Sequence, residues 1–253
     1  MSRPLPPSSP DAFDRRADGL SPLDDPRAAP DAAARIALLR SLCTGRERVL
    51  EVGCGTGINL VALADRIVEG VGVDFAPRTI ERARAIARRH GAANLRFAVG
   101  DARGLDAVRA ADGPFHLIIL AGVLEHIPER RCVLRACRRR LTRGGRLVVI
   151  MPHPANPGFL WRRLVQRRSP RIFASDLHLR PTELRGLARA AGLAPVTVRP
   201  LPFLPTFDDG PDIPARVRPL LRAFGILPHP ATRGAYAMVL RRSGHGRRGP
   251  GPP

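Results

Sequence analysis

The chain has 253 residues, of which 44% are hydrophobic, so it is long enough for one sizeable core. It contains neither the run of roughly 18 apolar residues that a membrane-spanning helix needs nor the apolar stretch of a secretory signal, so we expect a cytoplasmic protein. The four cysteines form no CxxC pair, which argues against a zinc site or a disulfide framework. The net charge of +20 is carried entirely by arginine and indicates either an anionic partner or a GC-biased genome.

A periodic middle part of the chain separates two ends of biased composition. Residues 1–30 are rich in Pro, Asp and Ser and predict a disordered leader, while the Gly/Arg/Pro-rich residues 243–253 predict a disordered tail. Residues 31–242 form the predicted folded domain, which opens with a helical pattern.

Apolar runs that predict strands alternate with helical stretches inside this domain. The strands are expected at 47–53, 68–74, Leu95–Val99, Phe115–Ala121 and Arg146–Met151, and later near Val196–Pro200 and Ala235–Arg241. The helices are expected at about 57–66, 78–90, 129–142 and Pro181–Ala191. Alternation of this kind predicts parallel βαβ units covered on both faces, and hence an α/β fold.

A glycine-rich segment, Glu51-Val-Gly53-Cys-Gly55-Thr-Gly57, lies between the first predicted strand and the first helix. Glycines allow a tight turn and a close approach of ligand to backbone, which predicts a nucleotide-like ligand at this edge of the sheet. A dinucleotide fingerprint would need glycine where the chain has Ile58, and Glu51 would repel a pyrophosphate. The same carboxylate suits a cationic ligand, so the segment favours S-adenosylmethionine over NAD.

Three further residues extend this predicted site. Asp74 ends the second strand, where a carboxylate can accept hydrogen bonds from both ribose hydroxyls; capping the next helix is the alternative role. Phe75 can lie against the adenine face or simply pack in the core. Asp101 follows the third strand and is placed to accept a hydrogen bond from the adenine amino group.

Five sequence blocks occur in a fixed order along the domain. They are Glu51–Gly57, Gly72-Val-Asp74, Gly100-Asp101-Ala102, Leu124-Glu-His-Ile127 and Leu141-Thr-Arg-Gly-Gly-Arg-Leu147. In this order they resemble the blocks of class I S-adenosylmethionine-dependent methyltransferases. The resemblance implies a Rossmann-like seven-stranded, mostly parallel sheet with helices on both faces and an antiparallel last strand. It also implies a cofactor site at Glu51, Gly53, Gly55, Gly57, Asp74, Asp101 and Ala102, with Ala121 and Gly122 near the methionine part.

The block at 123–128, Val-Leu-Glu-His-Ile-Pro, resembles the branch of this family that methylates quinone precursors, small metabolites and lipids. We therefore expect a small-molecule or lipid acceptor, with O-methylation ahead of C- or N-methylation. The Asp/Asn-Pro-Pro-Tyr block of nucleic-acid amino-group methyltransferases is absent after the fourth predicted strand, which argues against nucleic acid as a partner. An RNA methyltransferase, suggested by the charge, and a non-catalytic S-adenosylmethionine-binding interaction module are the alternatives.

Two histidines are the predicted catalytic bases because imidazole titrates near neutral pH. His126 follows the fourth strand at the expected mouth of the cofactor site, with a structural role as the alternative. His178 lies in a segment that resembles the histidine-containing stretch facing the acceptor in quinone-type O-methyltransferases. Glu125 could bind a substrate hydroxyl, and we predict no metal site because Glu125 and His126 alone are too few ligands.

The segments 152–180 and 202–230 are the expected lid or cap over the acceptor. Residues 158–173 combine the only Trp of the chain with several Arg and an apolar stripe. They predict either a lid helix with a solvated basic face or a peripheral contact with an anionic membrane surface.

Overall fold

The computed structural model describes residues 30–109, 112–154, 178–201 and 234–243. Most of the expected folded domain lies within these ranges. The expected leader, the tail and the greater part of the lid lie outside them, so the interpretations of 158–173 and 202–230 concern residues that are not described.

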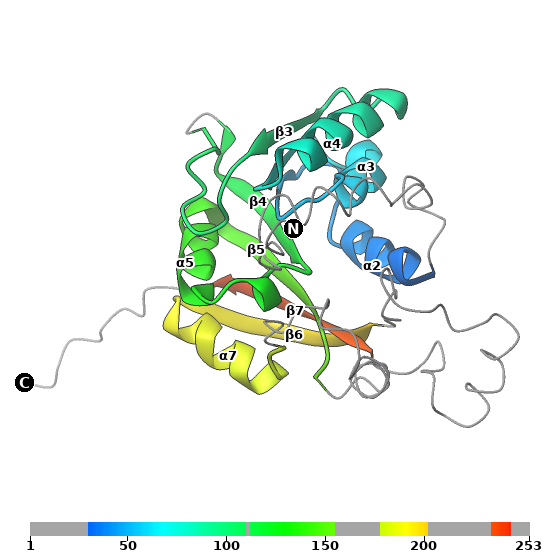
Figure 1. Ribbon diagram of the computed structural model, residues 1–253. Coiled ribbons are helices and arrows are strands. Elements are labelled where there is room, and N and C mark those ends of the chain that lie inside the picture. Colours follow the sequence, from blue (N-terminus) through cyan, green and yellow to red (C-terminus); the bar gives the residue numbers. More distant parts are fainter. Residues whose placement is uncertain (1–29, 110–111, 155–177, 202–233, 244–253) are drawn as a thin grey trace, which may run out of the picture.

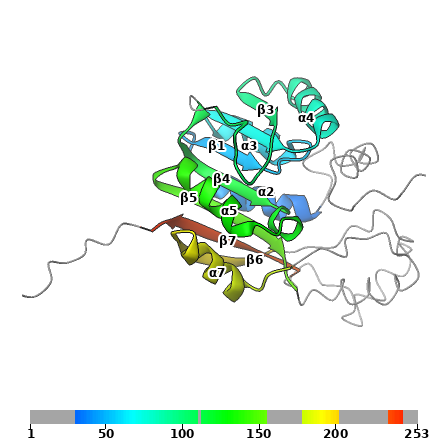
Figure 2. The same ribbon diagram turned by 60° about the vertical axis from the view of Figure 1, so that its left-hand side comes forward.

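Seven strands form one sheet (Figures 1 and 2). They are β1 Arg48–Val52, β2 Glu69–Asp74, β3 Leu95–Val99, β4 Phe115–Ala121, β5 Leu141–Pro152, β6 Leu193–Leu201 and β7 Ala235–Arg242. The strand order is β3-β2-β1-β4-β5-β7-β6. The first five strands pair in parallel, whereas β7 runs antiparallel to both β5 and β6. The predicted α/β fold with a mostly parallel sheet and an antiparallel last strand is confirmed.

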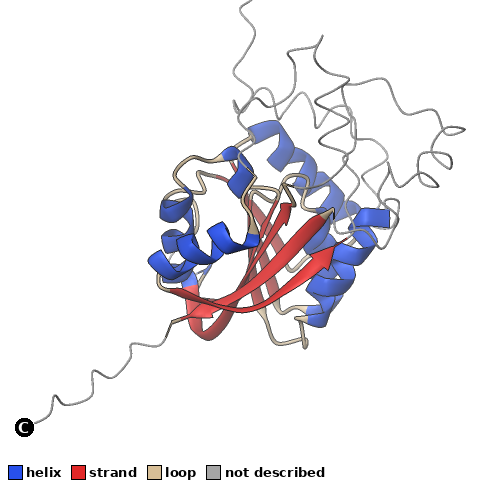
Figure 3. Ribbon diagram, turned by 90° about the horizontal axis from the view of Figure 1, so that it is seen from below, coloured by secondary structure: helices blue, strands red, loops and turns tan. Residues whose placement is uncertain are grey.

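Helices pack on both faces of the sheet (Figure 3). One face is covered by α2 Pro30–Ser41, α3 Ile58–Leu63 and α4 Pro77–Arg89, and the other by α5 Arg130–Arg140 and α7 Pro181–Ala190. Each face buries its own apolar cluster. The central strand β4 reads as an almost continuous apolar run because both of its faces are covered. No described helix is long and apolar enough to cross a membrane.

Some element boundaries differ from those expected. The helix expected over 129–142 ends at Arg140, because Leu141 already pairs with Phe115 at the start of β5. The register of this pairing shifts after Phe115, so β5 begins with an irregular stretch before the expected Arg146. The helix expected over 57–66 is divided into α3 and a short 3-10 helix, Ala64–Arg66.

The central strand offers a direct test of this packing. Ile118 in β4 is fully buried, so Ile118→Ala should lower the free energy of unfolding by about 2–5 kcal/mol through lost apolar burial and the cavity left behind. Urea denaturation measures this difference. The control is Val68→Ala, since Val68 is 58% exposed and should change stability by less than about 0.5 kcal/mol. Equal effects of the two substitutions would contradict the placement of β4 at the centre.

Candidate active site

A cavity of about 460 Å³ opens at the carboxyl ends of the central strands. Its walls come from the loops that follow β1, β2, β3 and β4 and from the turn before α5. Strand order reverses here, since β1 pairs with β2 on one side and with β4 on the other. Open α/β sheets bind ligands at this point, where loops diverge to opposite faces of the sheet.

The predicted glycines of the first loop have different surroundings. Gly53 and Gly55 line the cavity, and a Cβ on Gly55 would meet no atom within 4 Å. Gly57 has φ +77° and faces the protein, where a Cβ would lie 2.6 Å from the ring of Phe97. Gly55 therefore leaves room beside the backbone for a ligand, whereas a Cβ on Gly53 would clash with the Val123 side chain. Gly57 allows the turn to pack against β3.

Glu51 at the end of β1 is buried, with 1% of its surface exposed, and it does not itself line the cavity. Its Oε1 accepts a hydrogen bond of 2.6 Å from the Asn59 side chain, whose Oδ1 in turn accepts one from Arg35. Its Oε2 has no hydrogen-bond partner within the described part of the chain. Burial raises the pKa of Glu51 to about 7, against the opposing effects of Asn59 and Arg35. A buried carboxylate oxygen of this kind fits a nearby cationic or hydrogen-bond-donating ligand.

Asp74 lines the cavity at the end of β2 and holds two loops together. Its Oδ2 accepts a hydrogen bond of 2.9 Å from the Gly55 amide, and its Oδ1 accepts one of 3.1 Å from the Ala76 amide. Helix α4 begins at Pro77, and its N-cap residue Ala76 makes no side-chain cap. Each carboxylate oxygen can accept a second hydrogen bond, so Asp74 still has the capacity to bind ribose hydroxyls. Phe75 beside it is half-buried and also lines the cavity.

Asp101 lines the cavity after β3 and is held by Arg103. The backbone amide and the guanidinium of Arg103 both donate to the Asp101 carboxylate, and the guanidinium bond is the main factor that holds the pKa of Asp101 below its usual value. Arg103 also lies 3.9 Å from Glu129 on the other side of the cavity mouth. Ala102 completes this wall. Sequence reasoning missed Arg103, for which the only signal was a cation two residues after a candidate ligand-binding acid.

The residues that follow β4 form the cavity wall at which the acceptor is expected. Gly122, Val123 and His126 line the cavity, whereas Ala121 does not. His126 ends the 3-10 helix Leu124–His126 and is half-buried, and Glu125 beside it is 4% exposed.

His178 lies elsewhere, just before α7, and is not among the described residues that line the cavity. Its neighbour Leu179 accepts a hydrogen bond of 2.8 Å from the Tyr236 hydroxyl of β7. The structure thus brings His126 to the cavity, and it fixes the chain next to His178 against the end of the sheet. No group of three or more His, Cys, Asp or Glu residues suited to a metal ion occurs among the residues that the structure describes.

Comparison with known proteins agrees with this geometry. Residues 44–176, more than half of the chain, match the family described as "Methyltransferase domain". The Ubiquinone biosynthesis O-methyltransferase of Bordetella parapertussis is 33% identical over 169 residues, which cover 63% of this chain and 67% of that protein. The matched part thus spans about two thirds of the length of such relatives.

Two solved structures share the fold. The putative methyltransferase in complex with the Haloferax volcanii Trm112 methyltransferase activator has a TM-score of 0.65 at 20% identity and covers 91% of this chain and 97% of its own. The N-methyltransferase NodS from Bradyrhizobium japonicum, in complex with S-adenosyl-L-homocysteine, has a TM-score of 0.61 at 18% identity, with coverage of 92% and 97%. This chain belongs to the class I S-adenosylmethionine-dependent methyltransferases. It is an enzyme, and its cofactor is S-adenosylmethionine.

The raised pKa of Glu51 makes stability depend on pH. The pKa of about 7 lies above the ordinary value of 4.5, so Glu51 stabilises the fold below pH 4.5 and this contribution is lost as the pH rises through 7. Glu51→Gln removes the titrating group. We expect the unfolding free energy of the variant, relative to the unsubstituted protein, to rise by about 3 kcal/mol across that range.

Denaturant unfolding at about pH 4 and about pH 8, without cofactor, measures this difference. The control is Glu81→Gln, which removes an exposed carboxylate of α4 and should give a curve parallel to that of the unsubstituted protein. A parallel curve for Glu51→Gln as well would contradict the buried, proton-binding state of Glu51.

Proposed function

We propose that S-adenosylmethionine lies in the cavity with its ribose at Asp74, its adenine between Phe75 and Asp101, and its methionine end along Gly53 and Gly55 toward Glu51. The buried Glu51 oxygen without a partner in the described structure supports the last placement, because an ammonium or sulfonium group nearby would favour the ionised carboxylate. Gly57 contributes by shaping the turn and Ala102 by lining the cavity, and Ala121 directly precedes the cavity-lining Gly122. Asp101 would bind the adenine amino group while Arg103 keeps it ionised.

We propose further that the acceptor is a quinone-like or other small, lipid-like molecule that is methylated on oxygen. The observation that carries this is the wall after β4, where the His126 imidazole lines the cavity together with the apolar Val123 and Ile127. Relatives named Ubiquinone biosynthesis O-methyltransferase, 33% identical in one case, support the same acceptor class. Among the described residues that line the cavity, Arg103 is the one arginine, and its guanidinium is bound to Asp101. The described cavity walls therefore offer little positive charge for binding the phosphates of an RNA backbone.

Bound S-adenosylmethionine supplies an electrophilic methyl group on a charged sulfonium. The residues of the chain have to orient the acceptor oxygen, exclude water and take up the hydroxyl proton as the new O–C bond forms. His126 would accept that proton, since it lies at the cavity and a neutral imidazole has a nitrogen that can accept a proton. His178 stays a prediction for the acceptor side; the lid residues expected to complete that side lie outside the described ranges.

The acceptor class is tested by a labelled-methyl transfer screen. We expect transfer to a hydroxylated, prenylated benzene ring, with label recovered as a methyl ether. Soluble metabolite extract and total RNA serve as the comparison substrates. Label that enters only RNA, or only nitrogen or carbon atoms of metabolites, would contradict the proposal.

The cofactor placement is tested by Asp74→Ala, which removes the expected ribose contact and the two backbone contacts of the loop. We expect the dissociation constant for S-adenosylmethionine to rise about 10- to 100-fold, because hydrogen bonds to charged groups contribute about 1.5–3 kcal/mol. Calorimetric titration measures the change. Asp65→Ala, which removes an exposed carboxylate paired with Arg40, is the control and should leave binding unaltered. Undiminished binding by Asp74→Ala would place the ribose elsewhere.

The proton transfer is tested by His126→Ala. We expect turnover to fall about 100-fold or more, as is typical for a lost general base, with cofactor affinity nearly unchanged. His178→Ala should also lower turnover without weakening the cofactor, whereas His90→Ala, at an exposed position after α4, should do neither. Equal losses of turnover and of cofactor affinity in His126→Ala would give this histidine a structural role instead.

A further inference from the structure

The arginines of α5 fall into two groups. The helix reads Arg-Arg-Cys-Val-Leu-Arg-Ala-Cys-Arg-Arg-Arg and has no acidic residue. One group is bound to backbone carbonyls that fasten the helix to its surroundings: Arg130 to Leu124, Arg138 to Gly192, and Arg140 to Val108. The other group, Arg131, Arg135 and Arg139, is exposed, and its guanidinium groups make no hydrogen bond or ion pair with any residue in the described ranges. These three charges therefore form no contact within the described structure that would hold the helix in place.

The second group forms a stripe, because residues four apart lie on the same side of a helix. Like charges at this spacing destabilise a helix. Arg131 also stands in the first turn of α5, where the helix dipole is positive and the first turn itself holds no acidic residue, although Glu129 is the N-cap. Arg139, in the last turn, is favoured by the dipole. The like charges of the stripe thus repel one another along the helix, and an external anion would reduce that repulsion.

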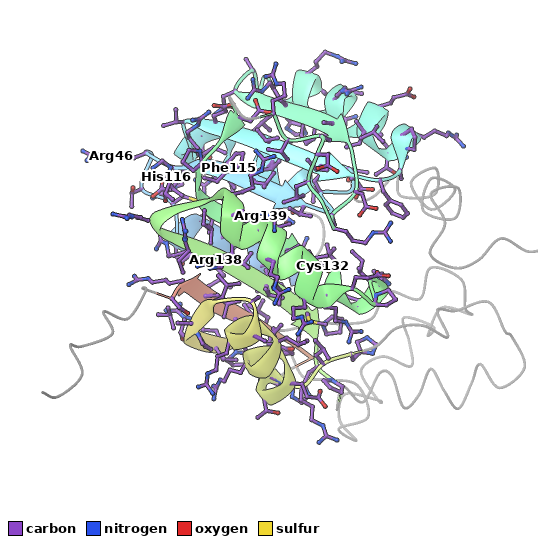
Figure 4. The ribbon with its side chains drawn as sticks, turned by 90° about the vertical axis from the view of Figure 1, so that its left-hand side faces the viewer. Arg46, Phe115, His116, Cys132, Arg138 and Arg139 are labelled. Atoms are coloured by element: carbon purple, nitrogen blue, oxygen red, sulfur yellow. The ribbon has the colours of Figure 1, made fainter. Side chains whose placement is uncertain are left out.

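The neighbouring helix α7 extends the stripe into a surface. Its Arg185 and Arg189, again four apart, are exposed and make no ion pair with a described residue. Helices α5 and α7 contact each other and lie side by side on one face of the sheet (Figure 2). Figure 4 looks onto this face, with Arg138 and Arg139 labelled on α5. We call Arg131, Arg135, Arg139, Arg185 and Arg189 the basic face.

We propose that the basic face docks the enzyme onto the anionic headgroups of a phospholipid surface. The proposal stands apart from the acceptor chemistry and from residues 158–173, since it uses only the charges of α5 and α7. Each basic residue near an anionic bilayer adds to adsorption, and arginine forks match phosphate oxygens. Helix α5 begins next to the cavity-lining Glu129, so docking along this face would hold the cavity close to the lipid surface.

Two observations favour lipid over nucleic acid. Aromatic side chains that could stack on bases are not exposed in the described part of the chain: Phe97, Phe115 and Tyr236 are buried, and Phe75 is half-buried in the cavity. None of the five arginines lines the cavity, so their contacts with a polynucleotide would not by themselves hold a base at the methyl donor. Binding to a layer of anionic lipid headgroups requires only positive charge on the protein surface.

The docking is electrostatic in character. The described large hydrophobic residues that are exposed, Val68, Val99 and Val196, lie outside α5 and α7. The two helices therefore offer no apolar side chain of this kind for insertion between acyl chains, and salt should screen the contact.

The test is co-sedimentation of the full chain with vesicles. We expect binding to phosphatidylcholine vesicles that contain about 30% phosphatidylglycerol at about 0.1 M salt, little binding to pure phosphatidylcholine, and release at about 0.5 M salt. The pair Arg135→Gln and Arg139→Gln should lower the partition constant roughly 30-fold, at about five-fold for each arginine. The matched control is Arg88→Gln with Arg89→Gln, which removes the same charge from the end of α4 on the opposite face of the sheet. Circular dichroism checks that both variants are folded.

The control pair should retain most of the binding. Equal losses in the two pairs would show that net charge alone drives adsorption and would overturn the proposal. Undiminished binding of Arg135→Gln with Arg139→Gln would overturn it too. Binding to double-stranded RNA that this pair abolishes, without binding to the vesicles, would replace the lipid by a nucleic acid. Methyl transfer to a water-soluble acceptor should be unaltered in both pairs, so failure of this proposal is distinguishable from failure of the proposed function.

Discussion

The hydrogen bond from the Gly55 amide to the Asp74 carboxylate joins the loops that follow β1 and β2. Just before it, the amides of Gly53 and Cys54 both donate to the Val73 carbonyl, so the pairing of the two strands continues into the turn. The turn thereby receives a fixed shape in which Gly55 faces open space. Because parallel strands end at the same edge of the sheet, the cavity forms where these loops and the loop after β4 diverge.

Burial of Glu51 follows from the same arrangement. The carboxylate lies near the end of a strand that is covered on both faces. The Asn59 side chain, through it Arg35, and the Leu60 backbone reach it from the surrounding helices. Desolvation therefore outweighs these contacts and raises the pKa of Glu51 to about 7. A cation at the cavity would shift the balance toward the ionised form, which couples cofactor binding to the protonation of one buried group. Glu51 thus contributes negative charge to the site, and Gly55 leaves room for the ligand beside the backbone.

Periodicity was sufficient to predict the sheet, because alternating apolar strands and amphipathic helices leave few topologies for a parallel α/β domain. It was insufficient at the start of β5, where Leu141 to Gly145 pair irregularly across a register shift that no periodic pattern encodes. The glycine motif predicted a ligand loop but could not separate Gly55, which faces space, from Gly57, which packs against Phe97. That distinction depends on a residue of β3 far along the chain. The role of Arg103 could not be predicted because its contact with Asp101 depends on the local loop conformation. The position of His178 could not be predicted because it depends on how α7 packs against β7.

The central claim is that the cavity beside Asp74 and Glu51 holds the methyl donor. A crystal structure of the protein with S-adenosylhomocysteine tests it most directly. We expect the ribose hydroxyls within about 3.2 Å of the Asp74 carboxylate oxygens, a normal hydrogen-bond distance, and the amino acid end directed along Gly53 and Gly55 toward Glu51. A ligand whose ribose contacts a different carboxylate, or which lies outside the loops after β1 and β2, would contradict it.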